Sequence, residues 1–497
     1  NVTKNIKELP PWGTVTRIEP SHFDAGTAYV SIDYHLVDNR DPYIFKTTDF
    51  GKTWTKISEG LPKHALGYVR TIAEDPNQKG LLFAGTGNGL FYSLDDGAHW
   101  TAFTTGLPHA PVTWDVVQKQ FHDLVVSTYG RGIYILDDIT PLEQMAQKTT
   151  DEPVHLFAPR DTFRLFPNGG AAITYSLKVA AKAPPKIEIL DSGGAIIRKL
   201  DAPGRAGMNR VEWNFLYDPP KLVALRTTPP ENPHIWEERR FRGSDSRQVL
   251  HWGIREAEVG PMALPGKYAV RLTVDGQSFT EPLTIVKNPN VHASDDDLAA
   301  AFKLQLRIRD DITKASEATN KLEWMRKQLD VIGGMLGRKN APPGQEKKEE
   351  AKDQTKEGKQ QRSEANADPE LLKAVEAMDQ KMQDVEDKFI SRADALSDDK
   401  YYSIPEKVYL HLIWLNGEVG TGAGDVAGGV DNPPTETAAS ILQTVEKDLV
   451  DAQSSYQNLV EKELPAFNRA LLDKGLTPVA LVRPASDNQE HEGGGFK

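Results

Sequence analysis

One pattern of chemically useful residues occurs twice near the start of the chain. The stretch "TTDFGKTW" (47–54) returns as "SLDDGAHW" (93–100), with serine or threonine, aspartate, glycine and tryptophan at one spacing. An aspartate in a tight turn accepts hydrogen bonds from amides of that turn, and glycine adopts backbone angles that other residues resist. We therefore expect the aspartate to stabilise a turn rather than to act in catalysis, and the tryptophan to pack between repeats. The residues concerned are Asp49, Gly51, Trp54, Asp95, Gly97 and Trp100.

A second group of polar residues lies on segments expected at the opposite end of the same strands. Because strands alternate in direction, these segments are the other turns and the linkers between repeats. The loop "DYHLVDNRDP" (33–42) is longer and more charged than a hairpin needs, which favours a role in binding. The turns "GNG" (87–89) and "GRG" (130–132) are explained as tight turns. The candidate binding residues are His35, Arg40, His64, His109, Tyr129 and Arg131.

Glycoside hydrolysis is the enzymatic chemistry that these segments could carry. It needs two carboxyl groups about 5 to 10 Å apart, one acting as the acid and the other as base or nucleophile. A sialidase would need three converging arginines, and Arg40, Arg70 and Arg131 are present without a sign that they converge. The catalytic residues stay unknown on this basis. The candidate carboxylates are Asp33, Asp38, Asp41 and Asp115.

Other chemistries lack a matching pattern. Neither Asp137-Asp138 nor the acidic run 295–297 has calcium-loop spacing, and the 12 histidines form no paired ligand motif. We therefore expect no metal and no cofactor. A net charge of −12 argues against a nucleic-acid groove, and the absence of cysteine excludes disulfides and thiolate chemistry. No apolar run is long enough to span a bilayer.

The repeated motif belongs to a longer sequence repeat. Trp54 and Trp100 are 46 residues apart, and each "GLP" tripeptide returns at the same spacing. In a third copy the residues at 87, 89, 91 and 95 return 43 positions later, at 130, 132, 134 and 138. A period near 45 with several short strands in each unit is typical of β-propeller blades. The third copy lacks a fourth strand, so the sequence predicts about two and a half to three blades.

These motifs are similar to those of the Asp-box (BNR) repeat propellers of the sortilin and xyloglucanase-like type. The resemblance covers about residues 1–140. More broadly, the chain resembles the C-terminal half of large secreted bacterial proteins known as BNR-repeat glycosyl hydrolases, in which sandwich and helical modules follow the propeller. The resemblance implies a secreted or periplasmic protein, and a ligand site on the face opposite the Asp-box turns.

In the rest of the chain the spacing of apolar residues changes twice. We assign residues 1–145 to the last blades of an incomplete propeller, and 146–290 to an immunoglobulin-like β-sandwich with an insertion at about 217–260. Residues 291–480 show apolar residues at helical spacing, which predicts an antiparallel helical bundle. Within it, the charged segment 339–368 reads as a flexible linker, and 481–497 as a disordered tail. The predicted fold is thus mostly β, then α.

An incomplete ring leaves strand edges unpaired, so we expect a partner that completes it. That partner is either an N-terminal propeller half or a second protein chain. Our first hypothesis is a secreted or periplasmic protein that binds glycan or peptide and takes part in assembly. The second is a glycoside hydrolase whose carboxylates are shared with, or lie wholly on, the missing half. The third is a structural subunit of an envelope complex.

Overall fold

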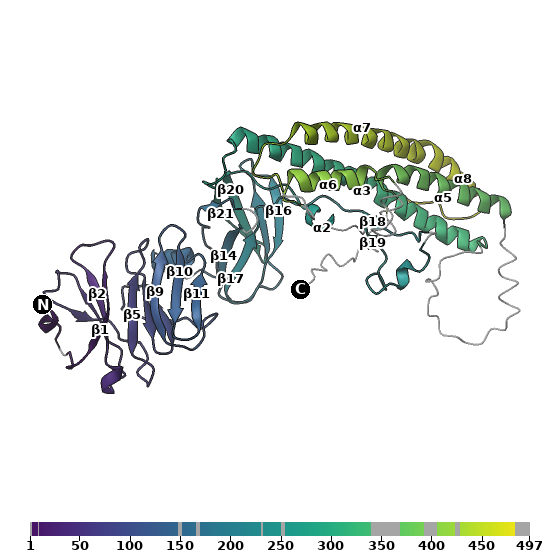
Figure 1. Ribbon diagram of the computed structural model, residues 1–497. Coiled ribbons are helices and arrows are strands. Elements are labelled where there is room, and N and C mark those ends of the chain that lie inside the picture. The colour runs from purple at the N-terminus through teal and green to yellow at the C-terminus, as the bar shows by residue number, and fades with distance from the viewer. Residues whose placement is uncertain are drawn as a thin grey trace, which may run out of the picture. The chain divides into compact units, whose positions relative to one another are not determined.

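The protein folds as two compact units, one rich in strands and one rich in helices (Figure 1). The first unit comprises Asn1–Phe163, Gly170–Asn214 and Gly266–Val286, and the second comprises Arg164–Gly169, Phe215–Pro265 and Lys287–Lys497. The predicted linker and tail fall almost wholly outside the described residues. The computed structural model describes residues 2–7, 9–147, 152–165, 169–229, 232–249, 254–338, 368–391, 405–422 and 428–482.

Three antiparallel sheets, here named A, B and C, open the first unit. In each sheet the strands pair in chain order, so every sheet is a meander. Sheet C has three strands where sheets A and B have four, and helix α1 (Thr140–Gln147) follows it. Two 3-10 turns, η1 (Thr3–Asn5) and η2 (His35–Val37), lie within sheet A's segment. The strands are β1 (Thr14–Pro20), β2 (Ala28–Asp33), β3 (Ile44–Thr47) and β4 (Thr55–Lys56) in A; β5 (Val69–Glu74), β6 (Leu82–Thr86), β7 (Gly89–Ser93) and β8 (Thr101–Ala102) in B; and β9 (Val112–Gln118), β10 (Asp123–Thr128) and β11 (Gly132–Leu136) in C.

The three sheets pack face to face in chain order. Tyr29 of sheet A shares a buried cluster with Ile72 and Leu82 of sheet B. Phe83, on the other face of sheet B, shares a second cluster with Leu124 of sheet C. Alternating side chains of sheet B are therefore buried on both of its faces, which requires the apolar strands that the sequence provides.

The repeat is not strictly periodic between sheets B and C. Thr86 pairs with Gly89 across a two-residue turn, whereas Thr128 pairs with Gly132 across a three-residue turn. The third strands therefore correspond at the spacing of 43 seen in the sequence, and the second strands at 42. This shift decides which residues of sheet C are equivalent to buried residues of sheet B.

Two further sheets, D and E, complete the first unit. Sheet D has the strand order β12-β14-β17, and sheet E the order β13-β21-β20-β15-β16. The hairpin between β20 and β21 turns at Asp275 and Gly276, both with positive φ, as the Asp-Gly pair predicts. The strands are β12 (Val154–Leu156), β13 (Thr162–Phe163), β14 (Ala171–Leu177), β15 (Lys186–Leu190), β16 (Ile196–Asp201), β17 (Gly207–Trp213), β20 (Gly266–Val274) and β21 (Gln277–Val286).

The second unit is built around long helices that bury apolar side chains in a shared core. Ser294 caps the longest helix: its Oγ accepts from the Asp297 amide at 3.1 Å, and the Asp297 carboxylate accepts from the Ser294 amide at 2.9 Å. Within the part of the chain that the structure describes, no helix combines the length and apolar character that a membrane crossing needs. The helices are α3 (Asp295–Met335), α5 (Pro369–Phe389), α6 (Val408–Val419), α7 (Glu436–Asn458), the π-helical η5 (Leu459–Glu463) and α8 (Leu464–Asp473).

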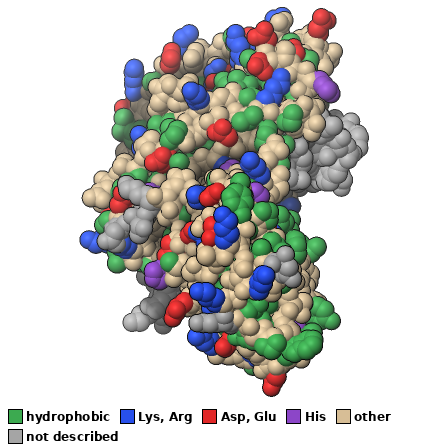
Figure 2. Space-filling view, turned by 90° about the vertical axis from the view of Figure 1, so that its left-hand side faces the viewer, with side chains coloured by type: hydrophobic (Ala, Val, Ile, Leu, Met, Phe, Trp, Pro, Cys, Tyr) green, Lys and Arg blue, Asp and Glu red, His purple; other side chains and the backbone are tan. Residues whose placement is uncertain are grey.

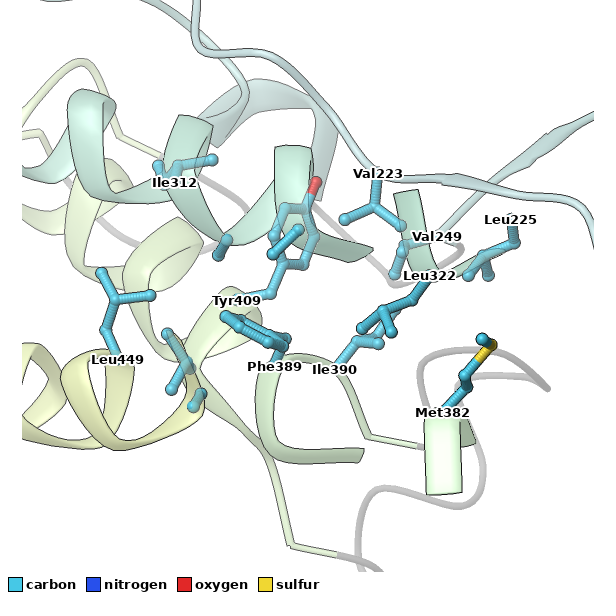
Figure 3. Close-up of a cluster of buried hydrophobic side chains, with 14 of the residues drawn as sticks. Val223, Leu225, Val249, Ile312, Leu322, Met382, Phe389, Ile390, Tyr409 and Leu449 are labelled. Atoms are coloured by element: carbon cyan, nitrogen blue, oxygen red, sulfur yellow. The ribbon is translucent and has the colours of Figure 1, made fainter. Parts of the chain in front are cut away.

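The segment between sheets D and E packs with the helices rather than with the strands that flank it. It holds β18 (Ala224–Leu225), η3 (Ile235–Glu237), β19 (Arg247–Gln248) and α2 (Ile254–Ala257). Apolar side chains of this segment, among them Val223, Leu225 and Val249, enter the helical core beside Leu322 and Met382 (Figure 3).

A polar anchor strengthens this attachment. The Glu323 carboxylate of α3 accepts hydrogen bonds from the Thr227 amide at 2.7 Å and from the Thr227 hydroxyl at 2.6 Å. Glu323 is itself buried, and Arg326 pairs with it at 3.2 Å. The insertion predicted at 217–260 thus forms part of the helical unit.

Candidate binding site

The first strand of each meander sheet carries a β-bulge at one repeated position. The register shifts between Val15 and Arg17 in β1, between Val69 and Thr71 in β5, and opposite Ser127 and Thr128 in β9. The bulged residues are Thr16, Arg70 and Thr113. Bulges re-aim side chains and are frequent beside functional sites, which directs attention to these three strands.

The residues next to the bulges form a buried polar cluster that joins all three sheets. Arg17 Nη1 donates to the Thr71 hydroxyl at 3.0 Å and to the Asp115 carbonyl oxygen at 2.6 Å. The Thr71 hydroxyl donates to Asp115 Oδ1 at 2.5 Å. Glu19 accepts from Arg17 Nη2 at 2.8 Å, and the guanidinium lies 4.3 Å from the centre of the Trp114 ring. One arginine therefore holds together strands β1, β5 and β9.

Asp115 in this cluster is fully buried. Burial raises the pKa of the Asp115 carboxyl to about 6, although the Arg17 charge and the Thr71 hydrogen bond act in the opposite direction. A raised pKa suits a general acid, but a general acid must also reach its substrate. Since Asp115 has no solvent-exposed surface, the observed geometry gives it the role of a structural anchor.

A second cluster lies at what we call the loop end of the sheets, where β2–β3, β6–β7 and β10–β11 are connected. Asp33 Oδ1 accepts from the His35 amide at 2.8 Å, and Asp33 Oδ2 lies 2.6 Å from His35 Nδ1. The His35 ring stacks on Tyr68 with a centroid separation of 4.7 Å. The Arg40 guanidinium carbon lies 6.0 Å from the centre of the same Tyr68 ring. The long loop of sheet A therefore rests on the segment that enters sheet B.

Gly87 explains how the turn of sheet B accommodates this cluster. A Cβ atom at Gly87 would lie 2.7 Å from the Tyr68 ring, closer than real contacts allow. The Gly87 amide donates to the Tyr68 carbonyl oxygen at 3.0 Å. The glycine thus serves the packing of the tyrosine as well as the turn itself.

The other predicted binding residues lie at the same end, and their side chains are exposed. His64 is exposed, and its Nδ1 accepts from the Leu66 amide at 3.1 Å. His109, Tyr129 and Arg131 are exposed on the linker and turn of sheet C. The structure therefore brings together His35 and Arg40 of the predicted set and leaves these four side chains in solvent.

The two remaining candidate carboxylates are exposed to solvent. The side chain of Asp38 is 97% exposed, with Arg40 Nη2 3.8 Å away, and Asp41 is also exposed. Asp38 has a φ of 65°, a backbone conformation that ends the short turn η2. Neither side chain has a buried environment that would prepare it for proton transfer.

The turns that carry the repeated Ser/Thr-x-Asp-x-Gly-x-x-Trp pattern lie at the opposite end, here called the box end, between the third and fourth strands. Asp49 Oδ1 accepts from the Thr53 amide at 2.8 Å, and Asp49 Oδ2 accepts from the Thr53 hydroxyl at 2.7 Å. These hydrogen bonds lower the pKa of the Asp49 carboxyl to about 2. Asp95 accepts from the His99 amide at 2.8 Å in the same manner. In both turns the aspartate closes a loop of its own chain.

The glycines and tryptophans of the two turns have separate roles. Gly51 and Gly97 have φ values of 79° and 88°, which side-chain-bearing residues rarely adopt. Trp100 packs between sheets A and B and donates from its Nε1 to the Ile57 carbonyl oxygen at 2.8 Å. Trp54 packs instead on the outer face of sheet A, beside Ile6.

A third polar cluster lies at the box end between sheets B and C. Asp75 Oδ1 accepts from the Asn77 amide at 2.6 Å, and Glu143 of α1 lies 2.7 Å from His122 Nδ1. Burial, together with the charge of Glu143, raises the pKa of Asp75 to about 7. The hydrogen bond with Glu143 raises the pKa of His122. Among the described residues, no group of three or more His, Cys, Asp or Glu side chains could hold a metal ion.

The sequence analysis missed Arg17, Tyr68 and Thr71. The partners that they contact on other sheets are remote in the chain, so the sequence around each residue held no sign of these contacts. One signal could have directed attention to these first strands. When the strands are aligned, Arg70 stands at the position that Thr16 and Thr113 occupy in the other two.

Comparison with known proteins gives distant structural matches alone. Neither a protein-family model nor a curated protein matches the chain. The GH74 enzyme of Niastella koreensis is 14% identical with a TM-score of 0.22, and the match covers 55% of this chain and 46% of that one. The GH74 xyloglucanase of Xanthomonas campestris is 14% identical with a TM-score of 0.21, and the match covers 54% and 38%. An extracellular domain assigned to a hybrid two-component system of B. thetaiotaomicron is 10% identical with a TM-score of 0.17, and the match covers 52% and 30%.

The chain therefore spans less than half the length of each of these proteins. A likeness of this degree decides neither an activity nor a ligand.

Proposed function

We propose that sheets A, B and C are consecutive blades of an Asp-box propeller, and that the chain is a binding and assembly module of a secreted or periplasmic protein. In this proposal the module functions within a larger ring. The observation that carries the proposal is an apolar face of sheet C that no described residue buries.

Equivalent positions in sheets B and C differ sharply in exposure. Leu90 of β7, on the face of sheet B that meets sheet C, is 1% exposed. The equivalent residue of β11, Ile133, is 71% exposed, and Ile135 two positions later is 60% exposed. Trp114 and Val116 of β9 lie on the same face and are also exposed. The side chains that would bury against a further sheet are thus present, and within the described part of the chain no sheet covers them.

The opposite end of the stack shows a related feature. Val15 and Ile18 of β1 lie on the outer face of sheet A and are exposed. Part of that face is covered by the N-terminal segment, whose Ile6 and Leu9 pack on it. Viewed from the side of sheet A, apolar side chains lie among charged ones on the surface (Figure 2).

The occupant that fits sheet C is another four-stranded sheet of the same repeat. The contact between sheets B and C is already made by equivalent residues, so a further sheet would continue an existing interface. Because the outer face of sheet C exposes several apolar side chains, leaving it uncovered invites unwanted association. The additional sheet would come from another segment of the same protein or from a second chain.

Site-specific photo-crosslinking tests this assembly. Replacement of Ile133 by a photoreactive phenylalanine derivative, in cells that produce the whole protein, should crosslink to a peptide carrying the Ser/Thr-x-Asp-x-Gly-x-x-Trp pattern. The same substitution at Val179, which is exposed in the first unit outside these sheets, is the control. Crosslinks at Ile133 that match the control, or that contain no such repeat, would refute the assembly.

The loop-end cluster is the proposed ligand site, and glycan or peptide is the proposed ligand. It unites side chains from the long loop of sheet A with the entry to sheet B, as loops on a rigid scaffold commonly do. Binding is better supported than glycoside hydrolysis, since Asp33 and Asp115 are buried whereas Asp38 and Asp41 are exposed. The remaining modules would serve as spacers or docking elements.

A further inference from the structure

Sheet B breaks the repeat at the bulge of its first strand. In sheets A and C the bulged residue is a threonine, and its hydroxyl lies 2.9 Å from a serine hydroxyl of the second strand. These pairs are Thr16 with Ser31 and Thr113 with Ser127. In sheet B the same position is Arg70, and Gly85 stands where the serine would be. Both members of the local hydroxyl pair have therefore been replaced, and a charge has been introduced.

Arg70 has no counter-charge within the described part of the chain. It is partly buried, and none of the described residues forms an ion pair or hydrogen bond with its side chain. Asp115 and Glu19, on the first strands of sheets C and A, are already paired with Arg17. A partly buried guanidinium without a partner is unfavourable, and such local exceptions tend to occur at functional sites.

The backbone of Arg70 lies at the same end of the sheets as the loop-end cluster. Arg70 follows Val69, whose partner Thr86 immediately precedes the β6–β7 turn, so its backbone lies at the loop end of the sheet. Tyr68, which carries His35 and Arg40 on its ring, is two residues away. Two arginines and a histidine thus belong to the loop end of these sheets, although the net charge of the whole chain is −12.

We infer that Arg70 forms, with Arg40, an anion subsite for the carboxylate of a uronic-acid-containing glycan. A guanidinium offers two parallel N–H donors that match the two oxygens of a carboxylate. The glycan nature of the ligand rests on the proposed function. The subsite does not depend on ring assembly, because all of its residues belong to sheets A and B.

Binding of a defined acidic oligosaccharide tests the subsite. Hexagalacturonate and its fully methyl-esterified form are titrated by calorimetry against the whole chain, since the ester keeps the sugar and removes the charge. We expect the acid to bind about tenfold or more tightly than the ester, and Arg70→Met to abolish that preference. Arg70→Lys should keep part of it. Arg239→Met, which removes an exposed arginine of the helical unit, should leave it unchanged.

Four results would overturn the inference. The acid and the ester bind equally, or Arg70→Met binds the acid as the unchanged protein does. A hexaglutamate peptide competes more strongly than hexagalacturonate, which assigns the site to acidic peptides. Arg70→Met loses hydrogen-exchange protection in β5, which makes the arginine structural. None of these results bears on the crosslinking of Ile133, so the two proposals fail separately.

Discussion

Replacement of Arg17 by methionine should destabilise the three sheets in a pH-dependent way. The substitution keeps much of the side-chain length and removes the charge that compensates Asp115. It also removes the donor to Thr71 and the partner of Glu19. Asp115 would remain as a fully buried carboxylate without a cation.

The expected loss in the free energy of unfolding follows from the burial of the Arg17–Asp115 pair. Removal of one partner from a buried ion pair costs about 3–5 kcal/mol, because the remaining charge is left uncompensated. The pKa of Asp115 is about 6 in the presence of Arg17 and rises further without it. A carboxyl whose folded-state pKa is raised stabilises the fold at low pH and loses that effect as the pH rises through the raised value. We therefore expect a loss of about 3–4 kcal/mol at about pH 8 and about 1–2 kcal/mol at about pH 5.

Hydrogen exchange measured by mass spectrometry is the assay, because it reports on β1, β5 and β9 separately from the helical unit. Arg17→Met should lower the protection of all three strands at once. The double variant Arg17→Met/Asp115→Asn should recover most of the loss at high pH, since it removes the orphaned charge. A uniform loss at both pH values, or a loss confined to β1, would refute the proposed cluster.

Three further predictions concern single residues. Burial and Glu143 raise the pKa of Asp75 to about 7 from an ordinary value of 3.8, so the stability it confers is present at low pH and lost as the pH rises through about 7. Asp75→Asn should therefore flatten the decline in β5–β6 turn protection between about pH 6 and about pH 8; an unchanged slope contradicts this. Gly87→Ala should displace the Tyr68 ring and cost about 1–3 kcal/mol, visible in near-ultraviolet dichroism, whereas Gly334→Ala, with open space around it, should not. If the assembled protein hydrolyses any member of a glycan panel, Asp33→Asn with retained folding should abolish turnover when Asp33 is one of the two catalytic carboxylates; full activity would exclude Asp33 and assign the chemistry to other carboxylates.

Local turns and helical faces follow from the sequence because their contacts are local. The Asp49 and Thr53 hydrogen bonds span four residues, so a short pattern contains both partners. The apolar stripe of the longest helix places Ile308, Ile312 and Leu322 in the core, since helical spacing alone brings them to one face. The spacing of apolar residues likewise predicts where the chain changes from strands to helices.

Tertiary structure alone decided which distant residues meet. Arg17 and Asp115 are 98 positions apart, and nothing near either residue indicates the other. Residues 215–265, which include the insertion predicted at 217–260, belong to the helical unit because their apolar side chains are buried in its core. This packing depends on the complementary shape of the helices. The exposure of Ile133 also needed coordinates, because its equivalent Leu90 is buried and only the presence of a neighbouring sheet distinguishes the two positions.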